Sequence, residues 1–288
     1  MSNILPSRDI DLRDRGGLIF YEKEHAYYNA DGVKYTGMTT FLGGFYEKFD
    51  AEKTARYKAI KDHLPVNDLK KLKALITSKL HEPSRTSWTK IHLFYDKLCK
   101  HNDVLSKKLP EQRQIYLDQW EKSSTDGSIE HDLREKDVIE NGITWNGKYY
   151  PYMNKTILDI TKDDVCVVPE IMVWNHEKEL CGLIDLPIFD KGIIHVLDYK
   201  TNKKIDMSGF MGKKMYHPFQ NQPDCNHSKY SAQLYGYQKM ACELTGLKPG
   251  ECWIISTSSE KYKRKTDEFI KCTDLSGEIN EAFASFNK

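Results

Sequence analysis

The stretch that decides the fold is residues 168–204, VPEIMVWNHEKELCGLIDLPIFDKGIIHVLDYKTNKK. Three segments within it, at 171–174, 182–189 and 193–200, are rich in β-branched and aromatic residues, which is typical of strands. The tripeptide Asp190-Lys191-Gly192 between the last two segments has the composition of a hairpin turn. We therefore predict three successive strands, with the last two paired through that turn.

Two carboxylates and an ammonium group converge if those strands pair. Asp185 and Asp198 then lie near each other, and Lys200 shares a face with Asp198 because side chains alternate along a strand. Neighbouring carboxylates repel, and a divalent cation such as Mg²⁺ or Mn²⁺ removes that repulsion. A nearby lysine can stabilise phosphate charge or help to activate a water molecule. The alternative is that all three are ordinary charged residues at the edge or end of a strand.

The composition restricts the kind of protein. The chain has 288 residues, enough for one large domain or for a core with an added lobe. Lys+Arg of 43 against Asp+Glu of 42 leaves a net charge of +1, so any nucleic-acid binding must come from local patches. The seven cysteines form no C-x-x-C pair and read as reduced intracellular thiols. With no apolar signal core and no membrane-spanning run, we expect a cytoplasmic protein without a membrane partner.

The first 122 residues are predicted to form a hairpin followed by a helical lobe. Residues 18–35 alternate as β-strands do around Asn29-Ala30-Asp31-Gly32. From about residue 51 to 122 the pattern is helical, and Pro65, Pro83 and Pro110 divide it into three or four helices. We therefore place a domain boundary between residues 122 and 123.

A histidine stands on the helix expected next. That helix is predicted to begin near Ser124 or Thr125, either of which can cap it, and to run to residue 140. His131 lies one turn after Gly127, and a glycine there allows another element to approach closely. Taken alone, such a histidine is more often a satisfied interior residue than a metal ligand.

A polar pair stands on a later helix, predicted at 228–245 and stopped by Gly246. Gln233 and Tyr237 are neighbours at positions i and i+4, and together they offer hydrogen-bond donors, acceptors and an aromatic ring. They could contact a phosphate, a base or Lys200. The equally good alternative is a surface glutamine beside a half-buried tyrosine.

The order of these motifs along the chain is distinctive. It runs G-S-I-E-H at 127–131, P-E at 169–170, G-L-I-D at 182–185, D-Y-K-T at 198–201 and Q-L-Y-G-Y at 233–237. This order resembles the PD-(D/E)xK nuclease superfamily, and within it the RecB-like branch, which includes phage exonucleases and the mitochondrial genome maintenance exonuclease. The resemblance covers residues 125–257, with weaker similarity at the N-terminal hairpin. Position 184 is isoleucine where the superfamily pattern has proline.

The resemblance implies roles for single residues. It implies metal ligands at His131, Asp185 and Asp198, joined by the backbone carbonyl of Tyr199. Lys200 resembles the catalytic lysine, and Glu170 resembles an acid that supports the metal site through water or the lysine. Gln233 and Tyr237 resemble the pair that lines the active site and touches the substrate strand, where Tyr237 would stack on terminal bases.

The cofactor implied is Mg²⁺ or Mn²⁺. Some RecB-like enzymes carry an iron–sulfur cluster bound by a tight run of C-terminal cysteines, and Cys225, Cys242, Cys252 and Cys272 are too widely spread for it. We therefore expect no iron–sulfur cluster.

The fold implied is α/β: a restriction-endonuclease-like core at 123–288, with a mixed central sheet flanked by helices, plus an N-terminal helical lobe. The activity implied is that of a metal-dependent DNA exonuclease in phage or bacterial recombination, replication or repair. Lys200, Lys203, Lys204, Lys213 and Lys214 would hold a single strand or a duplex end near the site. A single-strand annealing or other recombination protein is the partner it suggests. The alternatives are a structure-specific or restriction-type endonuclease and an inactive DNA-end-binding scaffold.

Overall fold

The structure is a computed structural model that describes residues 10–12, 15–64, 70, 86–258 and 263–286. The chain divides into two compact units. Residues Met1–Glu47 and Glu130–Lys288 form one, which we call the core unit, and Lys48–Ile129 form the other, which we call the helical unit. Both α-helices and mixed sheets are present, so the expected α/β class is confirmed.

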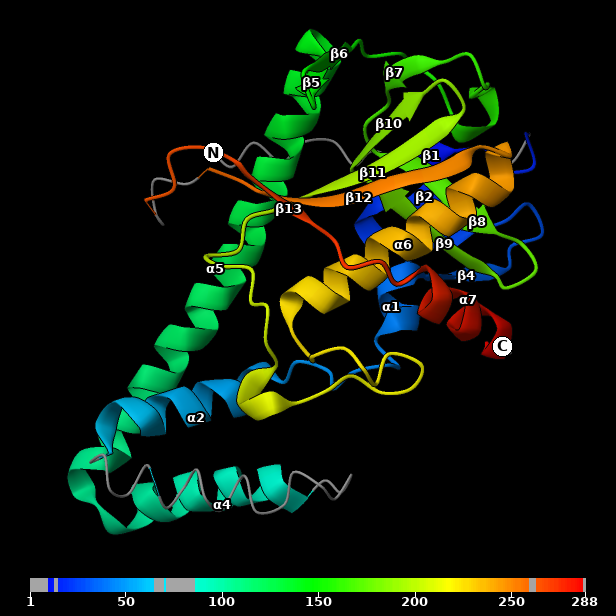
Figure 1. The fold of residues 1–288 in the computed structure, drawn as a ribbon. Coiled ribbons are helices and arrows are strands. Elements are labelled where there is room, and N and C mark those ends of the chain that lie inside the picture. Colours follow the sequence, from blue (N-terminus) through cyan, green and yellow to red (C-terminus); the bar gives the residue numbers. More distant parts are fainter. Residues whose placement is uncertain (1–9, 13–14, 65–69, 71–85, 259–262, 287–288) are drawn as a thin grey trace. The chain divides into compact units, whose positions relative to one another are not determined.

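The core unit contains a five-stranded mixed sheet in the order β13-β12-β11-β10-β7 (Figure 1). Strands β11 and β12 are parallel and the other neighbours are antiparallel. The strands are β7 (Val165–Val167), β10 (Leu186–Asp190), β11 (Ile193–Lys200), β12 (Lys248–Ser256) and β13 (Glu268–Lys271). The predicted hairpin turn is confirmed, because β10 pairs with β11 through Lys191 and Gly192, both with positive φ.

A six-stranded mixed sheet in the order β1-β2-β3-β4-β9-β8 completes the core unit together with the small hairpin β5-β6. Its strands are β1 (Ile10–Asp11), β2 (Ile19–Tyr21), β3 (Ala26–Tyr28), β4 (Lys34–Gly37), β9 (Leu180–Ile184) and β8 (Ile171–Asn175). The hairpin joins β5 (Ile143–Trp145) to β6 (Lys148–Tyr150). Short 3₁₀ turns lie at Glu22–Glu24, Ile157–Asp159 and Phe210–Gly212. The hairpin predicted at the N-terminus therefore belongs to the core unit, because β4 pairs with β9.

The prediction of one continuous strand over residues 182–189 is wrong. It is interrupted at Asp185, so that β9 and β10 belong to different sheets. Ile184 is buried in the larger hydrophobic cluster, and Leu186 is buried in a second cluster. Residues two apart on one continuous strand share a face, whereas Ile184 and Leu186 enter different cores, so the chain changes sheet at Asp185 and leaves that carboxylate at the crossing point.

Helix α6 (Asn226–Thr245) covers strands of both sheets (Figure 1). It contacts β8, β9, β11 and β12, and it also touches α1 (Met38–Leu42) and α7 (Ser276–Ser285). The predicted stop is confirmed, because Gly246 ends α6 in the left-handed conformation. This packing fixes the face of α6 that carries Gln233 and Tyr237 relative to the strand ends.

The helical unit is built from α2 (Ala51–His63), α4 (Thr86–His101) and the first part of α5 (Asp103–Asn141). Glu52 of α2 accepts hydrogen bonds from Arg56 and from Arg113 of α5. Pro110 lies inside α5 and does not divide two helices as predicted. Pro65 and Pro83 lie outside the described residues.

The helix start predicted at Ser124 or Thr125 is wrong, and the two compact units divide within α5, between Ile129 and Glu130. Helix α5 continues through both residues, and the Thr125 hydroxyl donates to the carbonyl of Glu121 one turn earlier. Side chains that bond back to the helix in this way do not cap a new one. Among the described helices, none is both long and apolar enough to cross a bilayer.

Candidate metal centre

Three side chains from different parts of the core unit converge. His131 comes from α5, Glu170 directly precedes β8, and Asp185 stands between β9 and β10. One ligand atom from each lies within 4.8 Å of the other two, and His131 Nδ1 is 3.2 Å from Asp185 Oδ2. One imidazole nitrogen and two carboxylate oxygens therefore surround a single point, which is a donor set suited to a divalent cation.

The position of Glu170 depends on an unusual backbone conformation. Its φ is +52°, in the left-handed region that residues other than glycine rarely adopt. Its N–H donates to the carbonyl of Asp185 at 3.1 Å, which ties the two acids together. Such a conformation costs on the order of 1–3 kcal/mol and is found most often at functional sites. Glu170 was expected only to support the metal site, whereas its carboxylate lies directly beside Asp185 and His131.

Asp198 and Lys200 form a pair next to these three residues. Leu186 pairs with Leu197, which brings Asp185 and Asp198 to neighbouring positions as predicted. Asp198 is 2 % exposed, and its Oδ2 lies 2.5 Å from Lys200 Nζ. That oxygen nevertheless accepts no well-directed hydrogen bond from the described residues. The Tyr199 backbone N–H donates to Asp185 Oδ2 at 3.3 Å, and a metal contact of the Tyr199 carbonyl stays a prediction.

The charges in this cluster change one another's pKa. Burial raises the pKa of the Asp185 carboxyl to about 6, and the Asp198 charge adds to the rise. Burial lowers the pKa of the Lys200 ammonium, but Asp198 and Asp185 outweigh it, so the pKa stays above its usual value. Lys200 is therefore charged near neutral pH. The negative charge of Asp185, in contrast, is destabilised by burial and by the neighbouring Asp198.

Gln233 and Tyr237 lie together, but Tyr237 cannot take the role expected of it. Gln233 Nε2 donates to the Tyr237 hydroxyl at 3.0 Å, and the Tyr237 side chain is buried at 6 % exposure. A Cβ on Gly182 would lie 2.3 Å from the Tyr237 ring, so only glycine admits the ring there. The expectation that Tyr237 stacks on bases is wrong, because a buried ring offers no face to a substrate.

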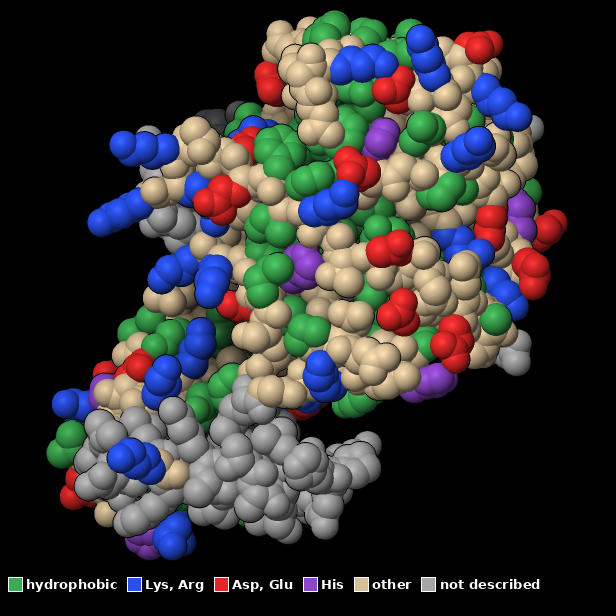
Figure 2. Space-filling model, in the orientation of Figure 1, with side chains coloured by type: hydrophobic (Ala, Val, Ile, Leu, Met, Phe, Trp, Pro, Cys, Tyr) green, Lys and Arg blue, Asp and Glu red, His purple; other side chains and the backbone are tan. Residues whose placement is uncertain are grey.

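The lysines near the site divide into two groups. Lys213 pairs with Glu47 and Asp224, which neutralise its charge within the core unit. Lys214 is exposed and keeps its charge, and its ammonium donates to the carbonyl of Asn221. Lys203 and Lys204 are exposed. Over the face shown in Figure 2, Lys and Arg side chains are interspersed with Asp and Glu, in keeping with the net charge of +1.

The other exposed lysines near the site belong to two loops that Arg264 joins. Arg264 donates to the carbonyls of Asn202 and Lys203 at 3.1 and 3.0 Å. This brings the exposed Lys203 and Lys204 near the exposed Lys263 and Lys265. We call these four residues the basic loops.

Two residues that support the centre were missed in the sequence. Arg134, one turn after His131 on α5, binds both carboxylate oxygens of Asp267 at 2.9 and 3.0 Å and also binds Glu130. Tyr230 lies under Lys200, with the ammonium 4.8 Å from its ring centre, and its hydroxyl donates to Asn202. The spacing of Glu130 and Arg134 was readable as a helical ion pair. The partners Asp267 and Lys200 were not, because they are far away in sequence.

Comparisons with known proteins add no family to this geometry. Neither the scan against protein-family models nor the search of curated proteins finds a match to the chain.

Proposed function

We propose that this chain is a divalent-metal-dependent deoxyribonuclease of the PD-(D/E)xK type that degrades DNA from its ends. The observation that carries the proposal is the convergence of His131, Glu170 and Asp185 beside the ion pair of Asp198 and Lys200. A nuclease that cuts phosphodiesters near neutral pH needs negative ligands for a cation and a separate positive charge for the phosphate. Both lie here at adjacent strand ends.

The residues present fit a divalent cation. The buried Asp198 Oδ2 lacks a well-directed hydrogen bond, and the Asp185 carboxyl resists ionisation because of burial and the Asp198 charge. A cation held by Asp185, Glu170 and His131 would favour the ionised form of Asp185, and its charge would also attract the neighbouring Asp198 carboxylate. When bound, it would supply charge relief for the phosphate and lower the pKa of a water molecule. The histidine nitrogen favours Mn²⁺ among the hard cations.

The protein's own groups supply the other half of the chemistry. Lys200 is cationic near neutral pH, so it acts by neutralising phosphate oxygens or by giving a proton, and not as a base. The Tyr230 ring and the Asp198 carboxylate restrict where its ammonium can lie. Because the ammonium is preorganised in this way, little reorganisation is required when phosphate charge develops.

The DNA backbone is proposed to lie along the basic loops. Lys203 follows Lys200 by three residues, and Arg264 holds the second loop against the first. Exposed lysines along a backbone path give affinity that does not depend on sequence and weakens with salt. A local patch of this kind suits a chain whose overall charge is near zero.

The test compares linear DNA with covalently closed circles of the same sequence, single-stranded and duplex, in Mg²⁺ and in Mn²⁺. We expect linear substrates to be degraded to short products and circles to persist. Equal cutting of circles would replace the exonuclease proposal with an endonuclease. Tight binding to DNA ends without any cleavage would indicate an inactive end-binding scaffold.

A further inference from the structure

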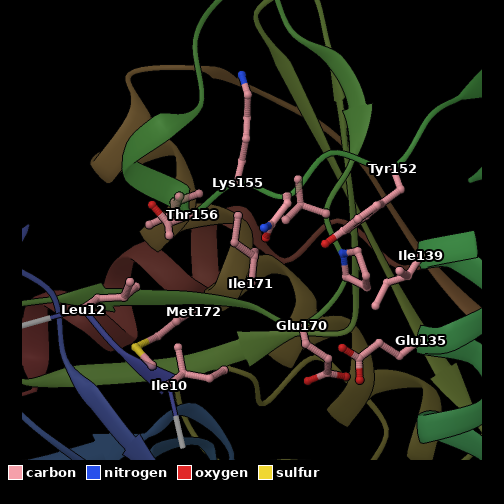
Figure 3. Close-up of a pocket in the computed structure, with 14 residues that line it drawn as sticks. Ile10, Leu12, Glu135, Ile139, Tyr152, Lys155, Thr156, Glu170, Ile171 and Met172 are labelled. Atoms are coloured by element: carbon pink, nitrogen blue, oxygen red, sulfur yellow. The ribbon is translucent and has the colours of Figure 1, made fainter. Parts of the chain in front are cut away.

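We infer that the pocket on the far side of Glu170 binds one nucleobase of the DNA strand whose phosphate lies at the metal centre. The inference rests on the proposed function and names a base-binding site that the PD-(D/E)xK resemblance does not supply. The pocket has a volume of about 160 Å³ and is formed by α5, the start of β1, residues 152–157 and residues 168–172 (Figure 3).

Glu170 links this pocket to the metal centre. Its carboxylate belongs to the group formed with His131 and Asp185, and its side chain also lines the pocket. A ligand in the pocket is therefore next to the point where the phosphate is proposed to lie. A nucleotide is a molecule with this arrangement, since its base and its phosphate are joined through one sugar.

The walls suit the flat faces of an aromatic ring. Ile139, Pro169, Ile171 and Met172 supply apolar surface, and Tyr152 points its hydroxyl toward the middle of the pocket (Figure 3). Protein cavities of about 150 Å³ accept a benzene ring. The pocket thus has room for one base, while the sugar and phosphate would remain outside.

Two carboxylates at one side of the pocket favour bases that carry amino groups. Glu135 and Glu170 turn their carboxylates toward each other at one side (Figure 3). The Lys155 ammonium extends away from the pocket and lies 2.5 Å from Asp164. Carboxylates accept hydrogen bonds from the exocyclic amino groups of adenine, cytosine and guanine. Thymine presents carbonyl oxygens on both sides of its ring N–H and is repelled.

The test fills the pocket without disturbing the metal centre. Ile139 is 37 % exposed at the pocket wall, so Ile139→Phe can place a larger side chain there without unfolding α5. Leu133→Phe is the matched control, because Leu133 is 55 % exposed on the same helix and does not line the pocket. The substrates are linear single strands in which one nucleotide at a time, counted from either end, is replaced by an abasic residue.

We expect wild-type protein and Leu133→Phe to cleave about tenfold more slowly when the abasic residue occupies one particular position, as the loss of one base contact predicts. Ile139→Phe should cleave the intact strand slowly, and an abasic residue at that position should not reduce its cleavage rate further. Wild-type protein should cleave dT-rich strands more slowly than dA- or dC-rich strands. In Glu135→Gln this difference in rate should be smaller. Wild-type cleavage that is equally fast at every abasic position would overturn the pocket while leaving the nuclease proposal intact. An absence of cleavage on all strands would overturn both.

Discussion

The contact between Gly182 and the Tyr237 ring makes a prediction that can be worked from the geometry. A Cβ at position 182 would lie 2.3, 3.1 and 3.2 Å from three atoms of the ring, where ordinary contacts are 3.4–4 Å. Gly182→Ala therefore forces the buried ring to move by about 1 Å. Overpacking of this kind costs about 1–3 kcal/mol, and the lower backbone entropy of the unfolded chain returns about 0.4–1 kcal/mol. We expect a net loss of about 1–2 kcal/mol.

Gly37→Ala is the matched control for this change. Gly37 pairs with Cys181, next to Gly182 in the same sheet, and a Cβ there meets nothing within 4 Å. Its φ is −64°, which any residue adopts, so Gly37→Ala should keep the entropic gain of about 0.4–1 kcal/mol with no clash to oppose it. The assay is thermal unfolding of both variants, alone and combined with Tyr237→Ala.

The double variant isolates the clash from other effects. With the ring removed, Gly182→Ala should cost little, so the two changes should not add. Moving the ring also displaces the hydroxyl that accepts from Gln233, so DNA cleavage should fall in Gly182→Ala and not in Gly37→Ala. Equal stabilities of the two glycine variants, or full additivity with Tyr237→Ala, would refute the reasoning.

Three further predictions concern the metal centre. Because burial raises the pKa of Asp185 to about 6, metal-free protein should lose stability as pH rises from about 4 to 6. Asp185→Asn should remove that loss. In thermal unfolding with chelator at pH 7, the variant should therefore be up to about 3 kcal/mol more stable than wild-type protein. His131→Ala should weaken Mn²⁺ binding in calorimetric titration more than it lowers the melting temperature of metal-free protein, and unchanged affinity with a large melting shift would make His131 structural. Arg134→Ala should weaken Mn²⁺ binding because it releases α5 from Asp267. Lys136→Ala, an exposed change on the same helix, should leave Mn²⁺ affinity unchanged. Equal affinities of the two variants would show that Arg134 does not support the metal centre.

The parts of the site that could be predicted depend on local pattern. The composition of Asp190-Lys191-Gly192 fixes a hairpin turn, and the turn fixes which residues of β10 and β11 are opposite. The proximity of Asp185 and Asp198 follows from that register. The end of α6 at Gly246 was likewise readable, because a left-handed glycine is a local feature.

The parts that could not be predicted depend on distant contacts. The interruption at Asp185 arises because Ile184 and Leu186 enter different hydrophobic clusters, and no pattern within 182–189 distinguishes two cores. The place of Glu170 beside Asp185 depends on a positive φ and a hydrogen bond to the Asp185 carbonyl. The charge of Lys213 looked available in sequence, but Glu47 and Asp224 neutralise it from elsewhere in the chain.

The measurement that tests the central claim most directly is single-turnover cleavage of linear single-stranded DNA in Mg²⁺ by Asp198→Asn. The matched control is Asp190→Asn, which changes the carboxylate at the hairpin end of β10, where it binds Lys148 and Tyr150. We predict that Asp198→Asn slows cleavage by at least about a hundredfold while circular dichroism shows an intact fold, and that Asp190→Asn stays near the wild-type rate. A folded Asp198→Asn variant that cleaves as fast as wild-type protein would contradict the assignment of this cluster as the catalytic centre.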